Sequence, residues 1–235
     1  ILDHYMQQDA DCRTAIECVT TKNYLGIFGE ARGPESITKD QLENIARETV
    51  KKIGYEQETY HWKNMEVGVH VHRQSPDIAQ GVDNNEKKEE GAGDQGIMFG
   101  YACKETPALM PAAILYSHDI LRMLAEARHA GDLPDLGPDA KSQISLQYKN
   151  GMPVGATSVV VSTQHTENVS QAEVREMVRK YVLKALPEGW MCPEDEFYVN
   201  PTGRFVIGGP ESDAGLTGRK IIVNTYGGAC PHGGG

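Results

Sequence analysis

The chain has 235 residues, of which 39% are hydrophobic, which is enough for one large domain or two modest ones with ordinary apolar cores. Its formal net charge of −10 argues against nucleic acid as a partner, because binding a polyanion depends on neutralising phosphates with Lys and Arg. The sequence contains no run of about 18 apolar residues, so it predicts no membrane span.

Five cysteines are scattered along the chain, an odd number without a C-x-x-C pair or a zinc-finger spacing. This pattern favours free thiols in a reducing, cytoplasmic setting. The chain begins at Ile1 without an initiator Met and stops in the glycine triplet 233–235, which is unusual for a terminus. We therefore expect an interior portion of a longer protein.

The first predicted elements are a β-hairpin, a helix and a further strand. Two β-rich runs, 14–21 and 24–31, are separated by the turn residues Lys22 and Asn23. After a helical segment, apolar and polar residues alternate over 65–72, which is typical of a half-buried strand.

The same order returns in the second half of the chain. Runs 142–149 and 156–165 flank a turn at Asn150 and Gly151, and a further strand is expected at 196–200. Strand, strand, helix, strand thus occurs twice. This repetition predicts an α+β protein with antiparallel hairpins rather than a parallel doubly wound sheet.

Both crossover helices carry the same start signal. Thr38 with Gln41, and Ser170 with Glu173, have the spacing of capping boxes. Each box precedes apolar residues on one helical face: Leu42, Ile45, Ala46, Val50 and Ile53 in the first helix, and Val174, Met177, Val178, Tyr181, Val182 and Ala185 in the second.

A polar, glycine-rich stretch connects the two units. Residues 75–96 are long for a loop in a compact protein, which is typical of a lid or a linker. A third helix is expected at roughly 108–130, ended by Gly131. Between them, Met98 and Phe99 are expected to pack in a core.

The connecting stretch ends in a motif that matches G-x-G-x-x-G at residues 91–96. A dinucleotide-binding fingerprint needs a strand immediately before its first glycine, and here the charged run 86–90 precedes it. The match is therefore accidental, and the motif does not indicate a Rossmann dinucleotide-binding site. What remains is a backbone that can approach a ligand closely, with one carboxylate at Asp94 and one amide at Gln95.

The wider motif GAGDQGIMFGYA (91–102) resembles the signature of the S-adenosylmethionine synthetases, also called methionine adenosyltransferases. The similarity continues in the order expected of that family through six further segments: RQSPDIAQGVD (73–83), DAKSQ (139–143), STQH (162–165), NPTGRFVIGGP (200–210), DAGLTGRKIIV (213–223) and TYGG (225–228). The resemblance implies three similar α+β units about a pseudo-threefold axis, of which the third is largely missing from this sequence.

The resemblance also sets expected domain bounds. Residues 1–103 would form the first unit, including the lid at 75–96, and 104–210 the second, while 211–235 would lead into the remainder of the protein, with segments exchanged between units. An upstream stretch resembling EGHPDK and a downstream stretch resembling AFSGKDPTKVDRS, which supply a histidine, lysines and magnesium-binding aspartates in the family, are not in this sequence.

The activity implied is the joining of methionine to ATP. The thioether sulfur attacks C5′ of the ribose, the triphosphate leaves, and the triphosphate is then cut to pyrophosphate and phosphate. A thioether already has its lone pair, so no nucleophile-activating base is required. The barrier is lowered by aligning sulfur with C5′ and by stabilising negative charge on the leaving group, which predicts cations, lysines and arginines.

The resemblance assigns the nucleotide and its phosphates to residues in the glycine-rich segments. Catalytic roles fall to Lys141, Arg219, Lys220 and Asp94, with Asp94 near the ribose and the forming sulfonium. The ATP-binding set is Asp139, Ala140, Lys141, Arg204, Phe205, Asp213, Arg219 and Lys220.

For methionine, the resemblance implies that Glu30 and Asp213 meet the ammonium and that Gln74 offers its amide. Glu17 corresponds to the family's potassium ligand, and Mg²⁺ is expected beside the phosphates. Active sites in the family lie between two subunits, so a dimer or a dimer of dimers is expected, without nucleic acid or membrane partners.

Some alternatives stay open. His70 and His72 face one side of a strand and could hold a metal, but without a third ligand structural roles are favoured. His165 ends a strand and is expected to orient a neighbour. A second reading of the whole chain is a catalytically inactive binding or regulatory subunit of the same fold, which the absent histidine and lysine motifs would favour.

Overall fold

A computed structural model describes residues 1–75 and 96–233 of the chain. These residues divide into two compact units. The first unit holds the chain from Ile1 to Met98 together with Pro210–Arg219, and the second holds Phe99–Gly209 together with the segment that starts at Lys220.

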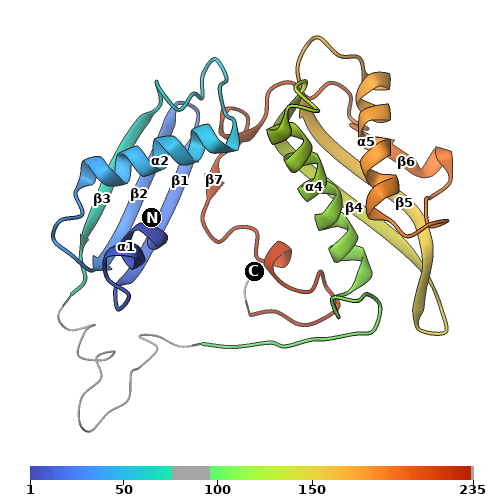
Figure 1. Cartoon of the computed structure of the whole chain (residues 1–235), viewed down its shortest axis with the longest axis horizontal. Helices are drawn as coiled ribbons and strands as arrows, with labels where there is room; N and C mark the ends of the chain where they lie inside the picture. Colours follow the sequence, from blue (N-terminus) through green and yellow to red (C-terminus); the bar gives the residue numbers. More distant parts are fainter. Residues whose placement is uncertain (76–95, 234–235) are drawn as a thin grey trace, which may run out of the picture. The chain divides into compact units, whose positions relative to one another are not determined.

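The first unit is a mixed four-stranded sheet in the order β3-β2-β1-β7, drawn in blue and teal in Figure 1 apart from β7. Its strands are β1 (Arg13–Thr21), β2 (Tyr24–Arg32), β3 (Glu66–Arg73) and β7 (Gly215–Leu216). β2 is antiparallel to β1 and parallel to β3, while β7 pairs antiparallel with the outer edge of β1. The helices α1 (Leu2–Gln8) and α2 (Lys39–Ile53) complete the unit.

The second unit is a three-stranded sheet in the order β4-β5-β6. Its strands are β4 (Leu136–Lys149), β5 (Met152–His165) and β6 (Phe197–Val199), and its α-helices are α4 (Ala112–Ala130) and α5 (Gln171–Ala185). β5 is antiparallel to β4 and parallel to β6. Three short 3₁₀ turns lie at Glu194–Glu196, Gly209–Glu211 and Ile222–Asn224, the second of them spanning the boundary between the units.

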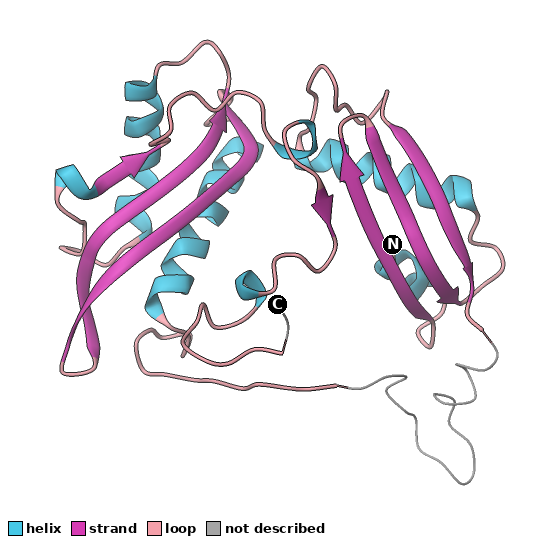
Figure 2. Cartoon of the chain, turned by 180° about the vertical axis from the view of Figure 1, so that it is seen from behind, coloured by secondary structure: helices cyan, strands magenta, loops and turns pink. Residues whose placement is uncertain are grey.

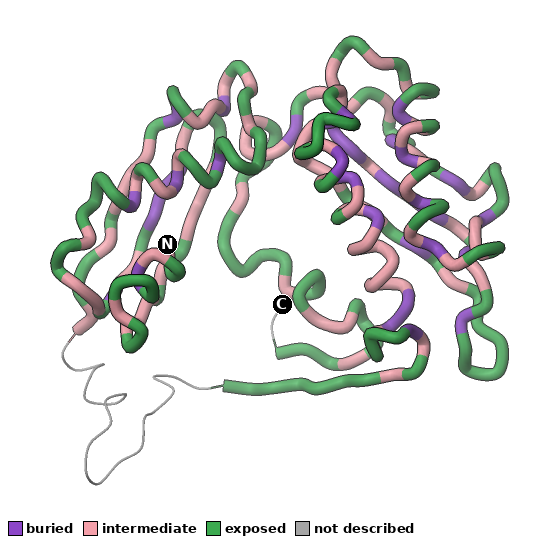
Figure 3. The backbone as a smooth tube through the Cα atoms, in the orientation of Figure 1, coloured by how far each residue is buried: buried purple, intermediate pink, exposed green. Residues whose placement is uncertain are grey.

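Each unit has its core on the helix side of its sheet. The buried residues of the second unit include Ile120 on α4, Val159 and Val161 on β5, and Val178 on α5. Figure 3 shows buried residues along the strands of this sheet and on the helices that pack against it. Figure 2 shows the opposite faces of the two sheets, which no described helix covers.

The α+β class and the repeated order of elements agree with the sequence-based prediction. Both capping boxes form: the Thr38 and Ser170 side chains each accept from the backbone N–H three residues on, and Gln41 and Glu173 bond back to the cap. Each sheet combines an antiparallel hairpin with one parallel pair. The strands of the parallel pair run in the same direction because a helix between them carries the chain back to the end of the sheet where the preceding strand began. No described helix is long and apolar enough to cross a membrane.

Three local predictions were wrong. β4 begins at Leu136 rather than at residue 142, because the stretch with Gly137 and Pro138 reads as a turn in sequence but forms an irregular part of the ladder. α4 begins at Ala112, since Pro111 occupies its N-cap. Met98 is 93% exposed and Phe99 38% exposed, because no helix or strand carries residues 96–102 into a core.

Candidate functional site

The segment DAKSQ lies on a bulged part of strand β4. Leu136 pairs with His165, and the next pair is Ala140 with Thr163, so the three residues 137–139 stand opposite Gln164 alone. A bulge of this kind bends the strand and redirects its side chains. Here it determines how Asp139 is presented.

The loop 205–209, which belongs to the segment NPTGRFVIGGP, is fastened to the end of β5. His165 exchanges two bonds with Phe205: its backbone N–H donates to the Phe205 carbonyl at 2.9 Å, and its Nε2 accepts the Phe205 N–H at 3.2 Å. The other ring nitrogen, Nδ1, is 2.8 Å from the Thr166 carbonyl oxygen, so it carries the proton. His165 therefore orients a neighbour, as its place at the strand end predicts.

The same loop is held by two further side chains. Gln164 donates from Nε2 to the Val206 carbonyl at 2.9 Å, and its Oε1 lies 3.4 Å from the Asp139 N–H. Asp139 in turn accepts the Gly209 N–H at Oδ2, at 2.9 Å. Asp139 and Phe205, two members of the predicted ATP-binding set, are thus tied to one folded corner of the second unit.

Lys141 projects from the helix-free face of the same sheet. Its neighbour Ser142 donates a hydrogen bond to the Ser117 carbonyl on α4 and so faces the helices. Because side chains alternate along a strand, Lys141 points to the opposite face of the sheet. On β5, Thr163 is buried toward the helices, so the next residue, Gln164, lies on the same helix-free face as Lys141. A cation is thereby placed on the face that carries the 205–209 loop.

Two other predicted phosphate ligands of this unit have different surroundings. Arg204 forms an ion pair with Glu167, and both side chains are well exposed. Lys220 is exposed at the start of the segment that returns to this unit. Surface pairs of this type contribute little to stability, so Arg204 can leave Glu167 for a phosphate at small cost.

In the first unit, predicted methionine ligands lie on and beside neighbouring strands. Glu30 on β2 pairs in register with His72 on β3, and its Oε2 is 3.7 Å from the His72 Nε2. His70 stacks on Phe28, with ring centroids 5.2 Å apart and planes within 10°. These contacts give both histidines structural partners.

Gln74 follows β3 and has an unusual amide. Its backbone N–H donates to the Ala31 carbonyl at 3.1 Å, while its Oε1 is buried without a hydrogen-bond partner among the described residues. A buried acceptor left unpaired is costly, so this oxygen calls for a donor beyond the described residues.

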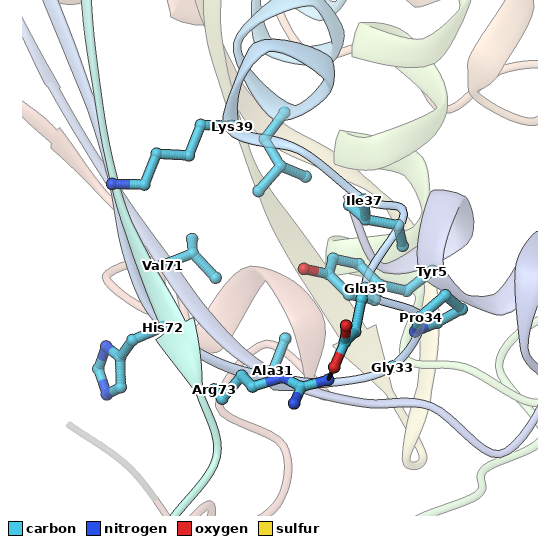
Figure 4. A pocket seen from close by; sticks show the side chains of 11 residues that line it. Tyr5, Ala31, Gly33, Pro34, Glu35, Ile37, Lys39, Val71, His72 and Arg73 are labelled. Atoms are coloured by element: carbon cyan, nitrogen blue, oxygen red, sulfur yellow. Dashed lines mark ion pairs between the residues drawn. The ribbon is translucent and has the colours of Figure 1, made fainter.

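Two cavities lie at the carboxyl ends of the parallel strands β2 and β3, the position where parallel sheets commonly bind ligands. One, of about 350 Å³, has an apolar floor that includes Tyr5 and Val71, and an ion pair of 2.7 Å between Arg73 and Glu35 crosses its rim (Figure 4). The other, of about 250 Å³, shares Arg73 and includes Gln74. A larger cavity of about 590 Å³ under α2 has no Asp, Glu, Lys or Arg in its lining.

The segment DAGLTGRKIIV reaches β1 through Thr217. Its Oγ1 accepts the Cys18 N–H at 2.7 Å, and its backbone N–H donates to the Cys18 carbonyl at 3.0 Å. Burial is the main cause that raises the pKa of the Cys18 thiol. Glu17, exposed on the adjacent position, faces away from α2, and Asp213 and Arg219 are exposed on the same segment as Thr217.

The structure does not test some of the site residues expected from the sequence. Asp94 and Gln95 lie outside the described residues, as does nearly all of the predicted lid at 75–96. In the described part of the chain, no three His, Cys, Asp or Glu side chains are close enough together to hold a metal ion. A shared phosphate cavity for Lys141, Arg219 and Lys220 stays a prediction.

Comparison with known proteins defines the class. The S-adenosylmethionine synthetase N-terminal domain model matches residues 1–76, the central domain model 89–205 and the C-terminal domain model 207–235. The chain belongs to the S-adenosylmethionine synthetase family.

Curated relatives give the same result over the whole chain. The chain is 65% identical over 235 residues to S-adenosylmethionine synthase 2 of Rhodospirillum rubrum and to S-adenosylmethionine synthase of Rhodospirillum centenum. It is 63% identical to S-adenosylmethionine synthase of Parvibaculum lavamentivorans. All of the chain is covered in each case, but it spans only 60% of the length of these relatives.

Sequence reasoning missed three residues that shape the site. Gln164 and Asn200 are polar yet only 5% exposed, and Gly208 is packed against Gln164. The available signal was their place inside the segments STQH and NPTGRFVIGGP. Their partners lie far away in sequence, so no local pattern could reveal the bonds.

Proposed function

We propose that the natural protein containing this chain is a methionine adenosyltransferase that forms S-adenosylmethionine from L-methionine and ATP. The observation that carries the proposal is the corner at Asp139 and Phe205, where two segments distant in sequence meet through bonds of Gln164 and His165. Family membership makes this corner a candidate nucleotide pocket.

The proposed reaction needs alignment and charge stabilisation rather than an activated nucleophile. The methionine sulfur attacks C5′ with its own lone pair and the C5′–O bond to the triphosphate breaks, so the negative charge grows on the leaving group. Lys141, Arg219 and Lys220 are proposed to bind that charge, Lys as a point charge and Arg with two parallel hydrogen bonds. Hydrolysis of the triphosphate to pyrophosphate and phosphate then completes the cycle.

The remaining nucleotide contacts are proposed for Asp139, Ala140, Arg204, Phe205 and Asp213. Asp94 is proposed to face the forming sulfonium, where a fixed carboxylate favours positive charge. For methionine, we propose Glu30, Asp213 and Gln74. The buried Oε1 of Gln74, which has no partner among residues 1–75 and 96–233, supports this role, because an ammonium would supply a donor.

Cofactors and assembly belong to the same proposal. Mg²⁺ would neutralise phosphate oxygens, and the Glu17 carboxylate would hold K⁺. We propose a dimer or a dimer of dimers with active sites between subunits. All five cysteines are free thiols, which supports a cytoplasmic setting.

For the fold, we propose three similar α+β units about a pseudo-threefold axis, with bounds at 1–103, 104–210 and 211 onward. The same order of strand, strand, helix and strand in both sheets supports this arrangement.

An assay of the purified natural protein tests the proposal. With methionine, ATP, Mg²⁺ and K⁺, we expect S-adenosylmethionine, pyrophosphate and phosphate in equal amounts. A protein that binds both substrates and forms no product would instead be the inactive subunit, and one that binds neither would contradict both readings.

A further inference from the structure

The carboxamide of Gln164 occupies the space opened by the bulge in β4. Gln164 is the one residue of β5 that stands opposite residues 137–139, and it is 5% exposed. Its Oε1 faces the Asp139 N–H, which the bulge removes from the regular ladder, and its Nε2 donates to the Val206 carbonyl on the loop. One side chain therefore links the bulge to the loop.

Two glycines enclose this carboxamide. A Cβ on Gly137 would lie 2.6 Å from the Gln164 Cδ, and a Cβ on Gly208 would lie 2.9 Å from the same atom. Neither glycine has a positive φ, so steric contact with Gln164, rather than backbone conformation, accounts for glycine at both positions. The bulge, the carboxamide and the loop form one tightly packed unit.

We propose that Gln164 is a positioning residue for the nucleotide pocket: its carboxamide holds Asp139 and the 205–209 loop in the single arrangement that receives ATP. The inference rests on the proposed function, and it assigns to Gln164 no contact with substrate. Loss of the carboxamide removes its link between the bulge and the loop and leaves the bond from the Gly209 N–H to Asp139, so the corner is held less firmly. This weakens ATP binding and leaves methionine binding unchanged.

The first test compares Gln164→Glu with Gln164→Ala in the complete natural protein. Glutamate keeps the acceptor toward Asp139 but places an oxygen against the Val206 carbonyl. We expect the KM for ATP to rise about tenfold in both variants, equivalent to about 1.4 kcal/mol, with an unchanged KM for methionine. Gln147→Ala, an exposed glutamine of β4, is the matched control and should keep both values.

The second test reaches the same contact from the loop and leaves Gln164 in place. Gly208→Ala drives a methyl group into the carboxamide and should raise the KM for ATP, whereas Gly155→Ala on β5, whose Cβ would meet nothing within 4 Å, should not. In the double variant Gln164→Ala with Gly208→Ala, the methyl group has room, so the effect of Gly208→Ala should largely disappear.

The outcomes separate the two proposals. If the wild-type protein forms S-adenosylmethionine but the KM for ATP is unchanged in Gln164→Ala, or if KM values for both substrates rise equally, the positioning role is wrong and the proposed function stands. If the two substitutions raise the KM for ATP additively in the double variant, the contact between Gly208 and the Gln164 carboxamide does not explain the effect of Gly208→Ala. If the wild-type protein forms no product, the proposed function fails on its own.

Discussion

The side chain of Asn200 hydrogen-bonds both backbone groups of Thr163. Its Oδ1 accepts the Thr163 N–H at 2.8 Å and its Nδ2 donates to the Thr163 carbonyl at 3.0 Å. The amide thus acts as an additional strand partner beside β5, next to the site corner. Asn200 also adopts a φ of 45°, a left-handed conformation that asparagine tolerates better than most residues.

Asn200→Asp should destabilise the protein. The carboxylate keeps the acceptor but faces the Thr163 carbonyl with an oxygen, so one buried group loses its partner at a cost of about 1–3 kcal/mol. Urea unfolding measures this change. Asn150→Asp is the matched control, because Asn150 has a similar φ of 51° in an exposed turn; an equal loss there would contradict the account.

The ion pairs of Glu194 should make the free energy of unfolding depend on pH. Bonds from Arg179 and then Arg175 lower its pKa to about 2. Both guanidinium groups also lie over the Phe197 ring, that of Arg175 at 4.6 Å and that of Arg179 at 4.9 Å from its centroid. Because the folded pKa is below the ordinary value of 4.5, the stabilisation is present above about pH 4.5 and is lost as the pH falls toward 2.

Glu194→Gln should therefore lower stability at neutral pH and differ progressively less from the wild type in acid. Unfolding curves at a series of pH values from neutral to acid measure the difference. The exposed Glu188→Gln serves as the comparison and should show little effect. A constant gap between Glu194→Gln and wild type across this range would show that the ion pairs are not its origin.

The imidazole of His165 should carry its proton on Nδ1, since Nε2 accepts the Phe205 N–H. Nitrogen NMR of the imidazole distinguishes the two tautomers. His165→Phe should lose about 1–3 kcal/mol through the unpaired Phe205 N–H, and His165→Gln, which restores an acceptor near Nε2, should lose less. The exposed His129→Gln is the control. Equal losses of stability in the two His165 variants would contradict the claim that Nε2 stabilises the protein as the acceptor of the Phe205 N–H.

The sequence predicted the α+β class, both capping boxes and the order of elements, because these depend on residues within a few positions of one another. It did not predict the bulge at 137–139 or the bonds of Gln164, whose partners are 25 and 42 residues away. It also misplaced Met98 and Phe99, because apolar composition alone does not say whether a segment reaches a core.

The candidate site shows the same division. Family motifs named Asp139 and Phe205, and the fold brings their segments together. The supporting side chains Gln164 and Asn200 also lie inside family motifs, but their role in the site follows from their burial and their bonds.

Lys141→Ala should lower turnover more than it weakens methionine binding. Removing a cation from the leaving triphosphate should cost about 100-fold in kcat, whereas the ground-state contacts of methionine are untouched. Steady-state kinetics with each substrate varied measures both. Lys149→Ala, at the far end of the same strand, is the matched control, and unchanged turnover in Lys141→Ala would refute a leaving-group role.

The most direct measurement is a crystal structure of the complete natural protein with a non-hydrolysable ATP analogue and without methionine, whose sulfur would displace the triphosphate at C5′. We expect the triphosphate beside Lys141, Arg219 and Lys220, with the adenosine at the corner of Asp139 and Phe205. A nucleotide bound elsewhere, with these side chains directed into solvent, would contradict the account.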